Sequence, residues 1–199
     1  MKRARMGDVY SVKVPNGYKI YQWAYSIPRE GDYIRVFDGL HEYIPTNLPK
    51  IVAGPHSYII PFDTKRAYRI GLAQMLGNFP VPDEYPFPEY EFSLHPNGAK
   101  KIGAIVVRPT IATSTAVNAG QWFRVNRIQD LPPQFQNITL LSSRLSPGWL
   151  LYLFDIGFTL YDLDCFFPGD PGANGNANLQ KYTDIVNEVL ARNQTKQNK

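Results

Sequence analysis

The chain has few of the residues that most often build disulfides, metal sites and nucleophilic sites. Among its 199 residues there is one cysteine, Cys165, and there are three histidines, His41, His56 and His95. A single cysteine excludes an internal disulfide and a cysteine-based zinc site, and it is typical of a reducing compartment. The histidines lack the short spacing of a helical metal motif, and the aspartates between 162 and 170 lack the spacing of a calcium loop. We expect no catalytic residues, no cofactor and no metal site.

Charge is also scarce, at 19% of residues, and its balance is a mild +4. Basic residues gather at the two ends, as Lys2, Arg3, Arg5, Arg192, Lys196 and Lys199. Chain ends are usually solvated, so this excess disfavours a nucleic-acid partner. Aspartates interrupt the most apolar stretch, 149–167, which argues against a membrane span, and no apolar run follows the basic start as in a signal peptide. We expect a cytoplasmic protein that does not enter a membrane.

What the chain does have is aromatic residues, at 14%, and 17 prolines, which favour short strands and ordered loops. Apolar and polar residues alternate over 9–14, the turn Pro-Asn-Gly occupies 15–17, and 18–25 reads as the return strand. Further strands are predicted at 33–37, 50–53, 57–62, 89–94, 101–108 and 121–125. The expected fold class is α+β and mainly β, with a small antiparallel barrel or a strongly bent sheet.

Helical signals are concentrated towards the end of the chain. Asn178 can cap a helix whose apolar stripe recurs at the helical period. The stripe consists of Leu179, Tyr182, Ile185, Val186, Val189 and Leu190. Residues 149–163 are predicted to be core of either type. Residues 63–76 fit a helix capped by Asp63 or Thr64, or a strand at 67–72, and we favour the strand.

The domain organisation is expected to have one boundary region. Residues 1–109 form a mainly β domain, and 110–199 form a C-terminal lobe, an extension packed on it that ends in the amphipathic helix. The segment 110–120, rich in threonine, alanine and serine, is the best junction. The two parts could equally be one continuous domain.

Aromatic side chains are the best candidates for contacts with a partner. Prolines keep 77–88 extended, and we expect this segment to lie across a surface and to pack its aromatic residues into a groove. The predicted partner-binding residues are Tyr18, Tyr21, Trp23, Tyr25, Tyr85 and Phe87. Tyrosine and tryptophan are frequent hot spots at protein interfaces. The aromatics of the first strands could instead form a stacking platform for bases or sugars, or belong to the core.

Two short segments resemble a known family. They are Gly-Asp-Val-Tyr at 7–10 with Pro-Asn-Gly at 15–17, and Gly-Asn-Phe-Pro-Val-Pro at 77–82. In order and spacing they resemble the bacterial immunity proteins of polymorphic-toxin systems, in the family numbered twenty-six. The resemblance covers the first half, to about Phe92. The chain departs from the pattern at 74–76, where Gln-Met-Leu stands in place of an aromatic residue.

The resemblance implies a protein that is not an enzyme and that binds and neutralises a cognate toxin in the cytoplasm. Inhibitors of nucleases often present acidic surfaces, and a local one could form here despite the net charge. Its members would be Glu30, Asp32, Asp38, Glu42, Asp83, Glu84, Glu89 and Glu91. The alternatives are a nucleic-acid- or carbohydrate-binding module, and an enzyme assembled from scattered residues such as His56 and Asp63.

Overall fold

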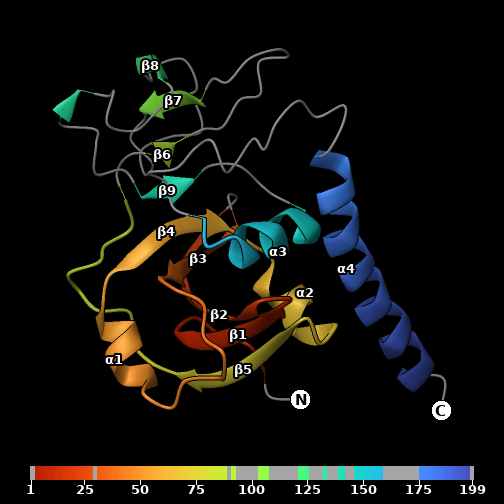
Figure 1. Cartoon of the computed structure of the whole chain (residues 1–199). Helices are drawn as coiled ribbons and strands as arrows, with labels where there is room; N and C mark the ends of the chain where they lie inside the picture. The colour runs from red at the N-terminus through yellow and green to blue at the C-terminus, as the bar shows by residue number, and fades with distance from the viewer. Residues whose placement is uncertain are drawn as a thin grey trace.

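The fold is built on an antiparallel sheet formed by strands between Asp8 and Asn78 (Figure 1). The computed structural model describes residues 3–28, 31–88, 91–92, 103–107, 121–125, 132–133, 139–141, 146–158 and 175–197. The strands are β1 (Asp8–Val14), β2 (Gly17–Ile27), β3 (Gly31–Phe37), β4 (His56–Pro61), β5 (Ala73–Asn78), β6 (Glu91–Phe92), β7 (Gly103–Val107), β8 (Gln121–Val125) and β9 (Leu140–Leu141). The helices are α1 (Leu48–Ala53), α2 (Thr64–Arg69), α3 (Pro147–Asp155) and α4 (Gly175–Gln197).

The sheet is open, so the expectation of a barrel is wrong. Five antiparallel strands follow the order β5-β1-β2-β3-β4. The two-residue strands β9 and β6 extend the β4 edge in parallel, and β7 pairs with β8 in a separate sheet. A small barrel fills its interior with its own side chains. Here the core side chains that face the sheet come from α3. Leu150, Leu153 and Phe154 are buried in the same cluster as Tyr10 and Tyr21 of the sheet.

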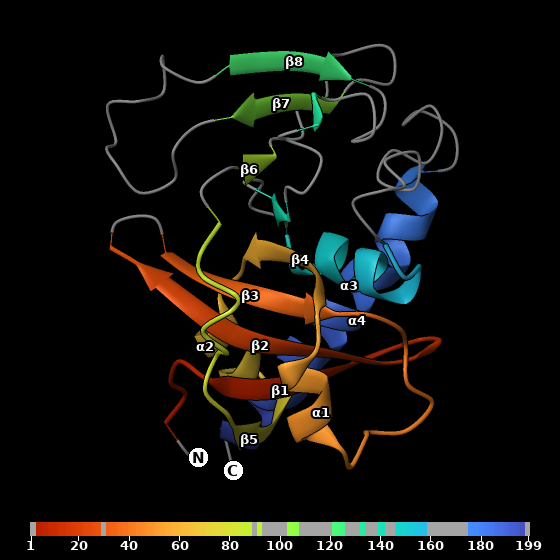
Figure 2. The same cartoon turned by 90° about the vertical axis from the view of Figure 1, so that its left-hand side faces the viewer.

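The two faces of the sheet are covered by different parts of the chain. Figure 1 places α1 on one side and α2, α3 and α4 on the other. On the helical side Val36, Tyr58 and Ile60 belong to the main core. On the opposite side α1 packs on the sheet through Val52, and residues 79–88 cross β1, β2 and β3 as a strap (Figure 2). Both faces are therefore buried along the middle strands.

Two short helices replace predicted strands. Residues 50–53 lie in α1, whose first turn contains Pro49, a position where the missing amide of proline is tolerated. Residues 64–69 form α2, and the Asp63 carboxylate accepts a hydrogen bond from the Arg66 amide at 2.9 Å. The strand expected at 67–72 is wrong, and the strand that follows begins at Ala73. The cap at Asp63 outweighs the apolar character of the segment.

The predicted apolar stripe near the end of the chain is confirmed in α4. The apolar positions from Leu179 to Leu190 are buried or half-buried, whereas Lys181 and Asp184 are exposed. The helix begins at Gly175, so Asn178 lies inside its first turn and does not cap it. Ser146 caps α3, which is buried along most of its length and ends before Gly157.

Residues from both predicted domains share one hydrophobic cluster. Tyr10 and Ile34 come from the first, and Leu151, Phe158 and Tyr182 from the second. The predicted junction at 110–120 lies outside the described residues. In the part of the chain that the structure describes, no helix is long and apolar enough to cross a membrane.

Candidate functional site

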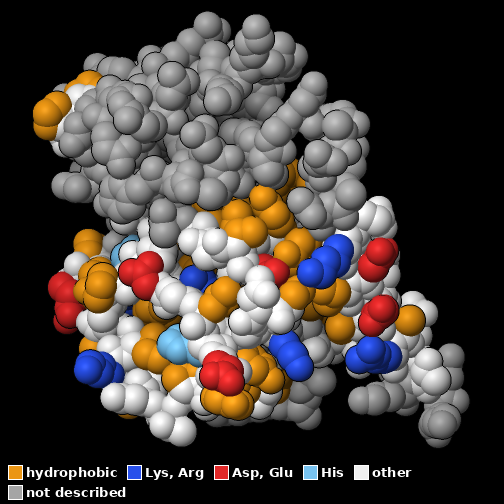
Figure 3. Space-filling model, in the orientation of Figure 1, with side chains coloured by type: hydrophobic (Ala, Val, Ile, Leu, Met, Phe, Trp, Pro, Cys, Tyr) orange, Lys and Arg blue, Asp and Glu red, His pale blue; other side chains and the backbone are white. Residues whose placement is uncertain are grey.

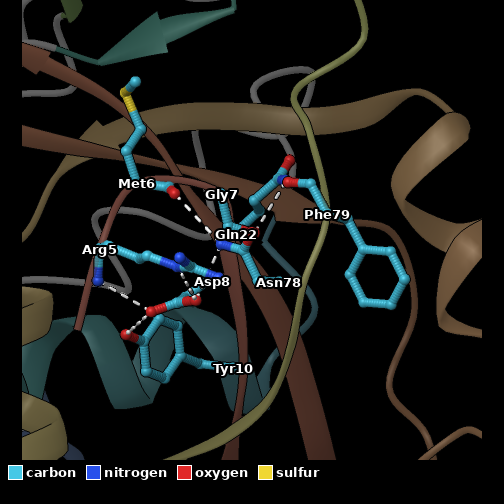
Figure 4. A network of polar contacts seen from close by, with 8 residues as sticks. All are labelled: Arg5, Met6, Gly7, Asp8, Tyr10, Gln22, Asn78 and Phe79. Atoms are coloured by element: carbon cyan, nitrogen blue, oxygen red, sulfur yellow. Dashed lines mark hydrogen bonds and ion pairs between the residues drawn. The ribbon is translucent and has the colours of Figure 1, made fainter. Parts of the chain in front are cut away.

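The two segments that carry the family resemblance meet in the fold, although 70 residues separate Asp8 from Asn78. The strands β1 and β5 pair with these two residues opposite each other. The Asn78 side chain donates to the Asp8 carboxylate at 2.9 Å, and the Phe79 amide donates to the Gly7 carbonyl at 2.9 Å (Figure 4). Residues of these two segments therefore hold β1 and β5 together.

The polar groups around this pairing are satisfied by one another. The Gln22 amide donates to the carbonyls of Gly7, at 3.3 Å, and Phe79, at 2.8 Å. The buried Asp8 carboxylate accepts a hydrogen bond from the Tyr10 hydroxyl at 3.3 Å. Burial raises the pKa of Tyr10, and the negative charge of Asp8 raises it further. Gly7 has φ +90°, and a Cβ there would lie 2.8 Å from the Phe79 carbonyl. These residues stabilise the strand register and face the interior.

A buried guanidinium continues the polar network beneath the strap. Arg35 donates to the Gln22 side chain at 3.1 Å, to the Gly54 carbonyl at 3.1 Å and to His56 Nδ1 at 3.3 Å. The Tyr85 ring covers the guanidinium at 4.4 Å. Burial, reinforced by Arg35, lowers the pKa of His56 to about 4, so this histidine is neutral near pH 7. Arg35 therefore joins the strap to the sheet through neutral partners.

The six predicted partner-binding aromatics divide into three groups. Tyr21 and Trp23 are buried in the main core, so their rings are not available at the surface. Tyr85 and Phe87 both contact Tyr25. The Tyr25 hydroxyl donates to the Tyr85 carbonyl at 2.7 Å, and the Tyr25 and Phe87 rings meet edge to face. The strap therefore packs its aromatic residues against the sheet.

Tyr18, the sixth aromatic, belongs to a surface formed by the hairpin and the loop after β3. Its amide donates to the His41 carbonyl at 2.8 Å, and the His41 amide donates back at 3.0 Å. A Cβ at Gly17 would lie 2.6 Å from the same carbonyl, so only glycine allows this approach. Tyr43, two residues after His41, is 74% exposed. We call Tyr18, His41, Glu42 and Tyr43 the hairpin–loop surface.

The side chain of a buried lysine in β2 also holds the loop that follows β3. Lys19 is 1% exposed, and its ammonium donates to the Gly39 carbonyl at 3.1 Å. Burial lowers the pKa of Lys19 to about 8, against the opposing influence of Asp38. Burial and Lys19 together lower the pKa of His41. The loop is therefore held to the sheet by backbone and side-chain contacts while Glu42 and Tyr43 stay exposed.

No sequence signal pointed to Tyr43, which lies in a proline-rich loop. Such a loop has no periodicity from which exposure could be predicted. Its position depends on the contact between Tyr18 and His41, which are distant in the chain. The sequence singled out the neighbouring Tyr18 as a partner-binding candidate and Asp38 and Glu42 as members of a possible acidic surface, and these two acidic residues are exposed.

Of the residues considered for catalysis, the two that the structure describes, His56 and Asp63, do not converge. His56 begins β4, and Asp63 follows the end of that strand, so the length of a six-residue strand, roughly 20 Å, separates them. Among the described residues no group of three or more His, Cys, Asp or Glu side chains could hold a metal ion. His95 and the aspartates at 162, 164 and 170 lie outside the described residues.

Most of the aromatic rings proposed as a stacking platform for bases or sugars lie in the interior of the protein. The hypothesis concerned six aromatics of the first three strands, Tyr18, Tyr21, Trp23, Tyr25, Tyr33 and Phe37. Four of them, Tyr21, Trp23, Tyr33 and Phe37, are buried. On the face seen in Figure 3, Lys and Arg side chains are interspersed with Asp and Glu over the described surface. Single-stranded nucleic acid is usually bound by exposed rings along a basic groove.

A scan against protein-family models and searches of curated proteins and of solved structures return no match to this chain.

Proposed function

We propose that this chain is an immunity protein that binds a cognate bacterial toxin in the cytoplasm and neutralises it by protein–protein contact. The hairpin–loop surface is the proposed contact. The observation that carries the proposal is Tyr43, a large aromatic side chain that is 74% exposed on a loop clamped to the sheet. Exposed aromatics on rigid supports are typical anchors of protein interfaces.

The rigidity of the loop favours binding. Association requires side chains and loops to become ordered, and a loop already held by Tyr18 and Lys19 loses less freedom than an unanchored one. Glu42 gives the surface local negative charge on a chain of net charge +4, and Asp38, directly after β3, is a second exposed carboxylate. A toxin with a basic patch beside an apolar pocket is the partner that fits this chemistry.

The test is co-purification with the product of a neighbouring gene for a modular toxin, followed by measurement of the Kd. Tyr43→Ala is expected to weaken binding by about 10- to 100-fold without changing the melting temperature, because the side chain is exposed. Met6→Ala is the matched control. Met6 is also large and exposed, at 58%, but it precedes β1, whereas Tyr18 pairs with the far end of that strand.

Two results would contradict the proposal. One is the absence of a complex at micromolar concentrations of both proteins. The other is a complex whose Kd responds equally to Tyr43→Ala and Met6→Ala, which would place the contact elsewhere on the molecule.

A further inference from the structure

A cavity of about 520 Å³ lies between the sheet and the C-terminal helix. It is bordered by the start of β3, the end of β4, α2, the first residue of α3 and the middle of α4. Its apolar walls consist of Pro61, Phe62, Ala67, Ile70, Leu72, Pro147, Val186 and Leu190. Pockets for small ligands usually measure about 300–1,000 Å³ and have mostly apolar walls.

The helix α4 is held in place on both sides of this cavity. Towards its start, a Cβ at Gly148 would lie 3.0 Å from the Thr183 hydroxyl, so α3 and α4 are in close contact there. Towards its end, the Asn193 side chain donates to the Ile70 carbonyl. Val186 lies between these two contacts. The space is therefore maintained by the fold and does not result from loose docking of α4.

Of the charged side chains along the cavity, Arg66 is the one whose hydrogen-bond donors have no partner among the described residues. Lys65 pairs with Asp32 at 3.2 Å and lies 4.5 Å from the Trp23 ring. The Asp63 carboxylate accepts from the Arg66 backbone. The Arg66 guanidinium has no hydrogen bond or ion pair with any described residue, so its five N–H donors remain available.

We propose that this cavity binds a small amphipathic carboxylate. Its apolar chain lies between α2 and α4, and its carboxylate accepts hydrogen bonds from Arg66. The planar guanidinium matches a carboxylate in a bidentate arrangement, which favours this group over a neutral alcohol of the same length. This site lies on residues distinct from the hairpin–loop surface and does not depend on toxin binding.

The test uses the full chain and sodium octanoate, with binding measured by isothermal titration calorimetry. We expect saturable binding at one site. Arg66→Gln is expected to weaken it at least 10-fold, and Arg69→Gln less than 2-fold. Arg69 is the matched control because it is exposed on the same helix and does not line the cavity. Octanol is expected to bind at least 10-fold more weakly than octanoate.

A second variant tests the apolar part of the site. Val186→Phe places a ring in the cavity and is expected to abolish binding while circular dichroism confirms a folded protein. If this variant does not fold, the comparison of Arg66→Gln with Arg69→Gln still decides. The proposal is overturned if octanoate shows no saturable binding, if both arginine variants bind equally well, or if a folded Val186→Phe binds like the wild type.

Discussion

At the scale of single residues, Lys19 is an ionisable group placed where charge is unfavourable. Its pKa is lowered from 10.5 to about 8 by burial. Between these values the unfolded state binds more protons than the folded state, so stability rises with pH and falls as pH drops through this window. We predict that the free energy of unfolding increases by about 2 kcal/mol from pH 7.5 to 9.5. Urea titrations at several pH values measure it.

Two lysine variants distinguish the contribution of Lys19 to the pH dependence of stability from the contributions of other ionisable groups. Lys19→Met is expected to be more stable than the wild type at pH 7.5 and to lose the rise with pH. Lys13→Met, at an exposed lysine on the adjacent strand, keeps the rise. The series stops at pH 9.5 because burial raises the pKa of Tyr58, so ionisation of tyrosine would then favour unfolding. An unchanged pH profile in Lys19→Met would refute the assignment.

At the scale of elements, the pairing of β1 with β5 depends on the contact between Asp8 and Asn78. Asn78→Ala removes a donor and leaves an oxygen of the fully buried Asp8 carboxylate with fewer partners. We predict a loss of roughly 2–3 kcal/mol in the free energy of unfolding. The Phe79 amide, bonded to the Gly7 carbonyl, should exchange hydrogen faster in the variant.

Asn47→Ala is the control for the Asn78 variant. Asn47 occupies the N-cap position of α1 but makes no side-chain capping hydrogen bond, so its loss is expected to change stability by less than about 0.5 kcal/mol. Equal effects of the two substitutions would show that the Asp8 contact contributes little.

Sequence patterns could identify elements whose signal is local. Val12 and Val14 alternate with polar residues, and Pro15 precedes a tight turn, so β1 and its hairpin were predictable. The helices α1 and α2 have six residues each, fewer than two turns, and show no helical period. For α2 the one usable signal was the capping residue Asp63.

The candidate site was less predictable because it depends on contacts between distant segments. Alternation places Tyr21 and Trp23 on one face of β2, but α3, more than a hundred residues later, decides that this face is interior. As polar residues of the strands, Gln22 and Arg35 would be expected to face solvent, yet the strap and α1 cover both side chains. Tyr43 becomes a candidate only once its loop is seen against Tyr18.

At the scale of the whole molecule, Asp155 joins three separate parts of the chain. Its carboxylate accepts from the Asn16 amide in the hairpin turn at 2.8 Å and from the Tyr182 hydroxyl of α4 at 2.6 Å. Asp155→Ala leaves the buried Tyr182 hydroxyl without this acceptor. We predict a loss of about 2–4 kcal/mol, measured by urea unfolding at pH 7.

The matched control for Asp155 is Asp184→Ala. Asp184 is an exposed residue of α4 that accepts a hydrogen bond only from the nearby Gln180 in the described part of the chain. Its substitution is expected to change stability by less than about 0.5 kcal/mol. An Asp155 variant as stable as the Asp184 variant would mean that the hairpin, α3 and α4 are held together by apolar packing alone.

The late position of α3 and α4 in the chain has a consequence for synthesis on the ribosome. The strands from β1 to β5 emerge first, and the residues that cover their helical face, from Leu150 to Tyr182, emerge more than 70 residues after Asn78. During that interval Tyr10 and Tyr21 are covered only in part, by Tyr68 and Phe62, and the layer that α3 supplies is still missing. Exposed apolar faces of this kind are the surfaces that chaperones bind. We therefore expect slower translation between β5 and α3 to lower the yield of folded protein.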